Sequence, residues 1–192
     1  RARRGAVGVC ALAGADVYKR REVGIDAAFV ALPPVFHEEA ALALAEAGVH
    51  ALVEKPLAAS VESGQRVAEA FKSAGLIGAV GYVERCNPAL LEMRKRLAEG
   101  QLGDVYQVVT RRQSPFPARI SDVGVVKDLA THDVDLAAWV AGSEYKEIYA
   151  QTAYLSGREH EDMGVAAGSF KNGVLVNHLG NWLTSVKDRT TI

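Results

Sequence analysis

Two groups of polar residues in this sequence have the types and spacing that proton-transfer chemistry needs, and the first centres on Lys55. Lys55 follows Glu54 and the apolar run 49–53, which predicts a short buried strand. A charged pair at the end of such a strand costs free energy unless it has a task. Pro56 ends the strand because it has no N–H to donate to a sheet. We therefore interpret Lys55 as a buried candidate acid or base at the carboxyl end of a strand.

The second group opens a predicted helix over residues 128–141. His132 and Asp135 follow Asp128 by four and seven residues, so the three side chains would share one face of the helix. An acidic residue one turn before a histidine can orient the ring or share a substrate hydroxyl with it. Alternatively, Asp128 is a simple N-terminal helix acid and His132 a surface histidine, and the motif alone fits this alternative better. In combination with Lys55, the motif indicates proton transfer at a cleft between two domains.

Composition and charge narrow the class of protein. The chain has 192 residues, of which 49% are hydrophobic and 23% charged, and its net charge is -1. This balance is typical of a globular protein and gives no electrostatic reason to bind nucleic acid or a membrane. No apolar run approaches the length of a membrane span. Cys10 and Cys86 are isolated and lack metal-ligand spacing, so we expect reduced packing residues, no metal site and a cytoplasmic protein.

The first part of the chain alternates short apolar strands with helices, which predicts a parallel sheet covered on both faces. Ligands bind such sheets at the carboxyl ends of the strands. The segments 33–34, 54–55 and 82–85 fall at those ends. The predicted strands lie at 7–12, 27–32, 49–53 and 76–82, and the predicted helices at 36–47 and 60–74.

The second part of the chain has a different character, and we place the domain boundary between Tyr82 and Val83. Asn172-Gly173 is a strong hairpin signal between two strand candidates. This part is therefore predicted to be α+β with antiparallel pairing. Its predicted elements are helices at 87–99 and 128–141, strands at 105–111, 146–155, 163–170 and 174–183, and an irregular stretch at 113–127.

Taken together, these motifs resemble those of the glucose–fructose oxidoreductase / inositol dehydrogenase / rhizopine catabolism (Gfo/Idh/MocA) family of NAD(P)-dependent oxidoreductases. The resemblance runs from about Gly24 to the C-terminus. Glu-Lys-Pro alone recurs by chance, but Glu-Lys-Pro after strand, helix and strand, with Asp-x-x-x-His in the second part, is a fairly specific pattern. The motifs are Leu32-Pro-Pro-Val-Phe-His37, Ala47-Gly-Val-His50, Glu54-Lys-Pro-Leu-Ala58, Arg85-Cys-Asn-Pro88, Gly100-Gln-Leu-Gly103 and Asp128-x-x-x-His132-x-x-Asp135.

The resemblance implies both a fold and a reaction. A Rossmann-type parallel sheet over 1–82 would bind the dinucleotide, and an α+β domain over 83–192, with a large open, mainly antiparallel sheet, would bind substrate and form homo-oligomers. The substrate would be a sugar, polyol or nucleotide sugar lying over the nicotinamide of NAD or NADP. Lys55 would hydrogen-bond the reacting hydroxyl, and His132 would take its proton as hydride leaves. Asp128 would hold the neighbouring hydroxyl or orient the other two side chains.

The resemblance also implies cofactor-binding positions, namely Asp16, Pro33, His37, Glu54, Lys55, Pro56 and Arg85. Three of them have a plain alternative. His37 would be a surface residue at a helix start, Glu54 the partner of a nearby cation, and Arg85 a structural ion pair at a domain junction. Leu32 stands where many members have Thr or Asn, which removes a side-chain hydrogen bond to the cofactor.

The family's phosphate-binding motif, Gly-x-Gly-x-x-Gly, does not occur in the sequence. We therefore expect the first strand and glycine-rich loop to be missing and the chain to be a fragment or the ordered part of a longer protein. Asp16 would bind a ribose or be a plain loop residue, whereas Arg20 and Arg21 would accept a 2′-phosphate, so NAD and NADP both stay open. The alternative function is a non-catalytic sensor or regulatory protein on the same fold, or a truncated inactive member.

The stretch 112–128 departs from the common family pattern. It is similar to a subgroup that acts on nucleotide-activated amino sugars such as UDP-N-acetylglucosamine. Arg112 and Arg119 would then meet the diphosphate, although two arginines on a proline-rich loop are more often solvated. The substrate-binding residues implied in this way are Lys55, Arg112, Asp128 and His132.

Overall fold

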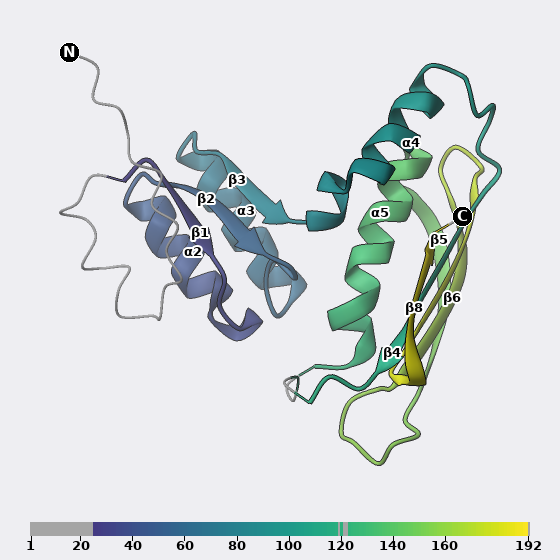
Figure 1. Cartoon of the computed structure of the whole chain (residues 1–192). Helices are drawn as coiled ribbons and strands as arrows, with labels where there is room; N and C mark the ends of the chain where they lie inside the picture. Colours follow the sequence, from purple (N-terminus) through teal and green to yellow (C-terminus); the bar gives the residue numbers. More distant parts are fainter. Residues whose placement is uncertain (1–24, 119, 121–122, 192) are drawn as a thin grey trace. The chain divides into compact units, whose positions relative to one another are not determined.

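A computed structural model describes residues 25–118, 120 and 123–191 (Figure 1). The chain divides into two compact units, Arg1–Tyr82 and Val83–Ile192. Several predicted features lie outside the described residues: the strand at 7–12, Cys10, Asp16, Arg20, Arg21 and Arg119.

The first unit contains a three-stranded parallel sheet in the order β1-β2-β3. The register pairs Val30 with Val53 and Glu54 with Gly81, so the strands end near one another. The predicted Rossmann-type parallel sheet is therefore confirmed. Its elements are β1 (Ala27–Val30), the 3-10 turn η1 (Pro34–Phe36), α2 (His37–Glu46), β2 (His50–Glu54), α3 (Val61–Ser73) and β3 (Gly78–Gly81).

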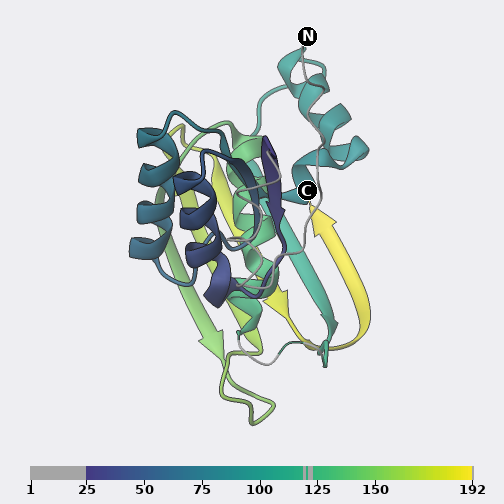
Figure 2. The same cartoon turned by 90° about the vertical axis from the view of Figure 1, so that its left-hand side faces the viewer.

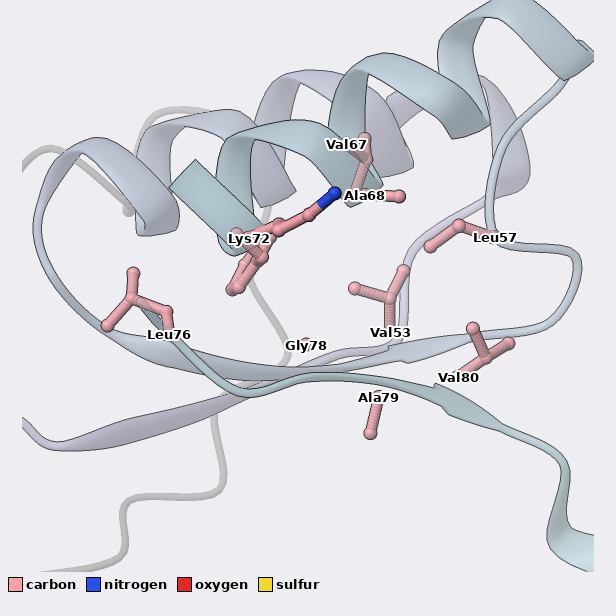
Figure 3. Close-up of a pocket in the computed structure, with 10 residues that line it drawn as sticks. Val53, Leu57, Val67, Ala68, Lys72, Leu76, Gly78, Ala79 and Val80 are labelled. Atoms are coloured by element: carbon pink, nitrogen blue, oxygen red, sulfur yellow. The ribbon is translucent and has the colours of Figure 1, made fainter. Parts of the chain in front are cut away.

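A serine caps the start of α3, and a glycine follows the end of each helix. The hydroxyl of Ser60 accepts a hydrogen bond from the backbone N of Ser63 at 3.2 Å, which starts α3. Gly48 and Gly75 follow the two helices with φ of 73° and 65°, the left-handed conformation that glycine adopts at little cost. The helices contact each other and lie on the same face of the sheet (Figures 2 and 3).

The opposite face of this sheet is less covered. Leu52 on β2 is 41% exposed, and Ile77 just before β3 is 68% exposed. Gly78 and Ala79 at the start of β3 are exposed as well. In the described residues, both helices lie on one face of the sheet, so the cover predicted for the second face is not supplied by them. Strand β3 is partly exposed and is therefore not the buried strand that the sequence predicted.

The second unit contains a five-stranded sheet in the order β5-β6-β7-β4-β8. Neighbouring strands pair antiparallel except β4 and β7, which pair in parallel. The sheet is thus mainly antiparallel, as predicted. The elements are η2 (Val83–Cys86), α4 (Pro88–Ala98), β4 (Gln107–Pro115), the π turn η3 (Val126–Ala130), α5 (Thr131–Ala141), β5 (Tyr145–Ala153), β6 (Met163–Phe170), β7 (Leu175–Asn181) and β8 (Leu183–Thr191).

Helix α5 packs on β4 and β7 and covers one face of this sheet (Figure 1). Leu136 and Ala137 on the helix are fully buried, as is Phe170 at the end of β6. Trp182, after β7, is 4% exposed and packs with Val125 in the core of this unit. The buried face fixes the position of α5, whose first turn carries the candidate histidine.

The other face of the second sheet is open. A shallow groove of about 390 Å³ runs across β4, β5, β6 and β7. Tyr149 is 70% exposed and Val165 is 40% exposed, and both line this groove with Val109 and Leu179. This apolar surface is the open face of the sheet.

Two predictions for the second unit are wrong, and one strand is missing from the prediction. Strand β4 continues to Pro115 and η3 begins at Val126, so the irregular stretch predicted at 113–127 is too long at both ends. Strand β8 was not predicted. Cys86 is exposed and therefore is not a packing residue.

Candidate functional site

The loops that follow β1 and β2 lie side by side at the carboxyl ends of these parallel strands. His37, the first residue of α2, is fully buried and joins the two loops. Its Nδ1 lies 2.8 Å from the carbonyl oxygen of Pro56, and its Nε2 lies 2.7 Å from that of Leu32. The alternative of a surface histidine is therefore wrong. The structure brings five predicted cofactor positions into one neighbourhood: Pro33, His37, Glu54, Lys55 and Pro56.

Lys55 is the first residue after β2, as the sequence predicted. It is half-buried, so the prediction of a buried lysine is wrong for the described unit. The Glu54 carboxylate accepts a hydrogen bond from the backbone N of Lys55 at 3.2 Å. Gly81 pairs with Glu54 across the sheet, and a Cβ at Gly81 would lie 3.2 Å from the Glu54 carboxylate. Because Gly81 lacks a side chain, the Glu54 carboxylate has room beside Lys55.

Asp128 and His132 lie where the π turn η3 meets α5. Both side chains are half-buried. The backbone N of Asp128 donates to the carbonyl of Gly124 at 3.1 Å, and the hydroxyl of Thr131 donates to the carbonyl of Lys127 at 3.0 Å. A π turn contains more residues than an α turn, so the single α-helical face predicted from the spacing is not regular here. The predicted catalytic set is thus divided between the units, with Lys55 in the first and this pair in the second.

Asp135, the third member of the predicted face, is bound to Arg85. The Arg85 Nε and Nη2 lie 2.7 Å and 2.6 Å from the two carboxylate oxygens of Asp135. This two-point contact is the strong form of an arginine–carboxylate pair. Arg85 therefore forms a structural ion pair, which is the alternative given for it in the sequence analysis. A contact between Arg85 and the cofactor stays a prediction.

Arg112 is surrounded by carboxylates of its own unit. Its Nη2 lies 2.7 Å from an Asp133 oxygen, its Nε lies 3.1 Å from both Asp133 oxygens, and its Nη1 lies 3.4 Å from Glu84. The side chains of Arg112, Asp133 and Glu84 are 12%, 5% and 11% exposed, respectively. Arg189 on β8 also pairs with Glu84, and burial lowers the pKa of Arg189. These contacts favour a structural role for Arg112 over the predicted contact with a substrate diphosphate.

A second polar cluster that the sequence did not predict surrounds His178 on β7. The Thr110 hydroxyl lies 2.6 Å from His178 Nδ1, and the Tyr145 hydroxyl lies 2.8 Å from Nε2. Tyr145 donates to the carbonyl of Val134 at 3.1 Å, so it accepts from Nε2–H and Thr110 donates to Nδ1. Burial lowers the pKa of His178, with an opposing effect from Asp133. Burial, aided by the nearby aspartates, raises the pKa of Tyr145.

Alternation along β4 is the sequence signal that could have found these clusters. Val108, Thr110 and Arg112 are spaced by two and therefore point to the same side of the strand. A threonine and an arginine that follow a buried valine at this spacing require buried polar partners. The partners themselves lie far away in sequence, so the strand pattern alone does not identify them.

A separate pocket of about 430 Å³ in the first unit lies between α3 and the strands beside it (Figure 3). Its walls are apolar, with Lys72 the charged residue among them. None of the predicted site residues lines it. Within the described residues, no three His, Cys, Asp or Glu side chains are grouped to hold a metal ion, and no helix is long and apolar enough to cross a membrane.

Comparison with known proteins assigns the family. Residues 12–82 match the family described as "Oxidoreductase family, NAD-binding Rossmann fold", and residues 90–192 match the "GFO/IDH/MocA C-terminal domain". The chain belongs to the Gfo/Idh/MocA oxidoreductase family. The predicted family is therefore confirmed.

Three similar proteins represent the range of this family. Inositol 2-dehydrogenase 2 of Saccharopolyspora erythraea is 34% identical over 158 residues, covering 80% of this chain and 47% of the relative. The structure of UDP-N-acetylglucosamine 3-dehydrogenase GnnA from Acidithiobacillus ferrooxidans superposes with a TM-score of 0.81 at 26% identity, covering 91% and 56% of the two chains. The structure of the WlbA dehydrogenase from Bordetella pertussis in complex with NADH and UDP-GlcNAcA superposes with a TM-score of 0.81 at 29% identity. The match covers 91% of this chain and 55% of the WlbA chain.

The Gfo/Idh/MocA chain described here spans about half the length of the curated relatives it matches. Its two family matches cover both the NAD-binding part and the C-terminal part of the family pattern. The named relatives act on different substrates, so membership in the family leaves the substrate open.

Proposed function

We propose that this protein is a nicotinamide-dependent dehydrogenase that oxidises a hydroxyl carbon of a sugar, polyol or nucleotide sugar. The observation that carries the proposal is the joint match to the NAD-binding and C-terminal parts of one oxidoreductase family. The relatives named as inositol and UDP-N-acetylglucosamine dehydrogenases support the substrate class, and the relative solved with NADH supports NAD as the first cofactor to test.

The geometry of the first unit fits a dinucleotide. The loops after β1 and β2 converge at the carboxyl ends of parallel strands, and His37 ties them together by its two carbonyl contacts. Parallel α/β sheets bind ligands at this edge. Pro33, Glu54 and Pro56 would line the nicotinamide end of the cofactor there.

Each proposed catalytic residue has a defined task. The bound nicotinamide supplies the hydride acceptor. His132 takes the proton of the reacting hydroxyl as the hydride leaves the same carbon, and it returns this proton in the reverse reaction. Lys55 donates a hydrogen bond to that hydroxyl oxygen and stabilises the charge that develops on it. Asp128 accepts a hydrogen bond from the neighbouring hydroxyl and so orients the substrate.

A substrate panel tests the proposed function. The purified full-length protein is supplied with NAD⁺ or NADP⁺ and with inositols, hexoses or UDP-N-acetylglucosamine, and formation of reduced nicotinamide is followed by fluorescence. We expect turnover with at least one polyhydroxylated substrate. Binding of NADH without turnover on any of them would contradict the dehydrogenase proposal and would favour a sensor on the same fold.

We also propose that the protein forms homo-oligomers through the open face of the second sheet. The apolar groove carrying Val109, Tyr149, Val165 and Leu179 supports this proposal, because exposed apolar patches of this kind mark contact surfaces. Sedimentation of the full-length protein tests it, and a monomer at micromolar concentration would contradict it.

A further inference from the structure

His37 is a buried histidine whose two ring nitrogens both face backbone carbonyls. The side chain is 0% exposed. Nδ1 is 2.8 Å from the oxygen of Pro56 and Nε2 is 2.7 Å from the oxygen of Leu32, both within the normal range of N–H···O hydrogen bonds. The contacts reach 19 residues forward and five residues back along the chain. One side chain therefore connects the segment after β1 with the segment after β2.

The two carbonyls lie where the sheet can no longer pair them. β1 ends at Val30 and β2 at Glu54, so Leu32 and Pro56 both lie just beyond a strand. Pro33 and Pro56 have no backbone N–H, so at these positions the two loops cannot be joined by the usual backbone hydrogen bonds. Both residues are half-buried, and the imidazole lies within hydrogen-bond distance of both carbonyl oxygens.

The two contacts place both ring nitrogens within hydrogen-bond distance of an acceptor. A carbonyl oxygen only accepts hydrogen bonds, so each nitrogen must carry a hydrogen if both contacts are hydrogen bonds. A neutral imidazole has one N–H, and its second nitrogen would then turn a lone pair towards an oxygen. In the neutral ring, one nitrogen donates to one carbonyl and the other nitrogen packs against the second carbonyl. The ring bridges the two loops in either tautomer.

We propose that His37 is a positioning residue for Lys55. Its ring contacts the carbonyl of Pro56, directly after Lys55, and the carbonyl of Leu32, directly before Pro33. This clamp fixes the backbone from which the Lys55 side chain extends. The inference rests on the proposed function, which gives Lys55 its role at the reacting hydroxyl. His37 itself does not touch substrate in this scheme.

The ring state of His37 can be measured without any substrate. Nitrogen-15 NMR of the wild-type imidazole, assigned by comparison with His37→Gln, counts the ring nitrogens that carry hydrogen at neutral pH. We expect a ring N–H that is protected from exchange with solvent. Ring N–H groups that all exchange freely with solvent would overturn the two-carbonyl clamp.

Asparagine and glutamine separate the two arms of the clamp. The amide nitrogen of His37→Asn occupies nearly the place of Nδ1 and keeps the contact with Pro56, whereas that of His37→Gln mimics Nε2 and keeps the contact with Leu32. Misplacement of a catalytic group by about 1 Å can lower turnover by about a hundredfold. We expect a loss of kcat of that order for His37→Gln, a smaller loss for His37→Asn, and little change in NADH affinity for either.

His50 provides the matched control. It lies at the opposite end of β2, and its Nδ1 accepts a hydrogen bond from the backbone N of Ile77 at 3.0 Å. We expect His50→Gln to leave kcat and its pH profile unchanged, whereas His37→Gln shifts the pH profile because Lys55 is displaced. Equal losses in His37→Asn and His37→Gln that track their thermal stability would overturn the positioning role. A protected His37 N–H in a wild-type protein that binds NADH but transfers no hydride would overturn the proposed function and leave only the clamp.

Discussion

Arg112 illustrates how this protein handles buried charge at the scale of single residues. Its guanidinium makes several hydrogen bonds with Asp133, and its second carboxylate partner, Glu84, also pairs with Arg189. Arg112, Asp133 and Glu84 have lost most of their hydration, so removing one charge leaves its partner buried without compensation. The group links η2, α5, β4 and β8 within the second unit.

Replacing Asp133 by asparagine tests this assignment. The change leaves the Arg112 charge with Glu84 as its remaining partner at 3.4 Å, so we expect the free energy of unfolding to fall by about 3 kcal/mol. Glu92→Gln is the control, since Glu92 pairs with Arg96 on the surface of α4 and both are about half exposed. The Glu92→Gln change should alter the free energy of unfolding by no more than about 0.5 kcal/mol. Equal effects in urea denaturation would contradict the structural role of the buried group.

Sequence identifies individual residues unevenly. Lys55 was placed correctly at a strand end because an apolar run followed by Glu-Lys-Pro is a local pattern. The pairing of Arg85 with Asp135 joins residues 50 positions apart, and that of Arg112 with Asp133 joins residues 21 apart. No local periodicity encodes such partners. For the same reason, the two carbonyl contacts of His37 could not be predicted.

At the scale of elements, His178 on the central strand β7 connects the neighbouring strand β4 to the edge strand β5. It faces Thr110 from β4, Tyr145 from β5 and the Asp133 carboxylate from α5. Because burial lowers its pKa in the folded protein, the unfolded chain takes up a proton at a higher pH than the folded chain does. Acidification through the ordinary histidine range therefore favours unfolding.

The lowered pKa of His178 in the folded protein predicts how stability depends on pH. The free energy of unfolding should fall as the pH is lowered from about pH 8 to about pH 5, and the contribution of His178 should level off below its folded pKa. His178→Gln removes the titrating group and should flatten that part of the profile. Urea titrations at a series of pH values measure it, and an equal slope in wild type and variant would show that His178 does not contribute.

The elements themselves were predictable where capping and apolar periodicity are clear. The helices predicted at 36–47 and 60–74 correspond to α2 and α3. Ser60 caps the start of α3, and Gly48 and Gly75 follow the two helices. Strand β8 was missed because its sequence, LTSVKDRTT, has no apolar alternation and its residues are largely exposed. The π turn was missed because an inserted residue leaves the apolar pattern of the following helix intact.

At the scale of the whole molecule, the fold class could be predicted from the sequence and the strand order could not. Alternating strands and helices indicate a parallel sheet, and a run of strands with an Asn-Gly turn indicates antiparallel pairing. The parallel pair formed by β4 and β7 joins strands separated by α5, β5 and β6. Such a pairing depends on the whole core and has no local signature.

We propose that Lys55 and His132 handle the proton of the reacting hydroxyl, and single-turnover hydride transfer measures their contribution to this step. The full-length wild type, Lys55→Ala and His132→Asn are each mixed with saturating cofactor and the best substrate of the panel, and nicotinamide fluorescence is followed. We predict that both variants bind NADH with the wild-type affinity and transfer hydride at least about a hundredfold more slowly. Wild-type rates in both variants would contradict the account.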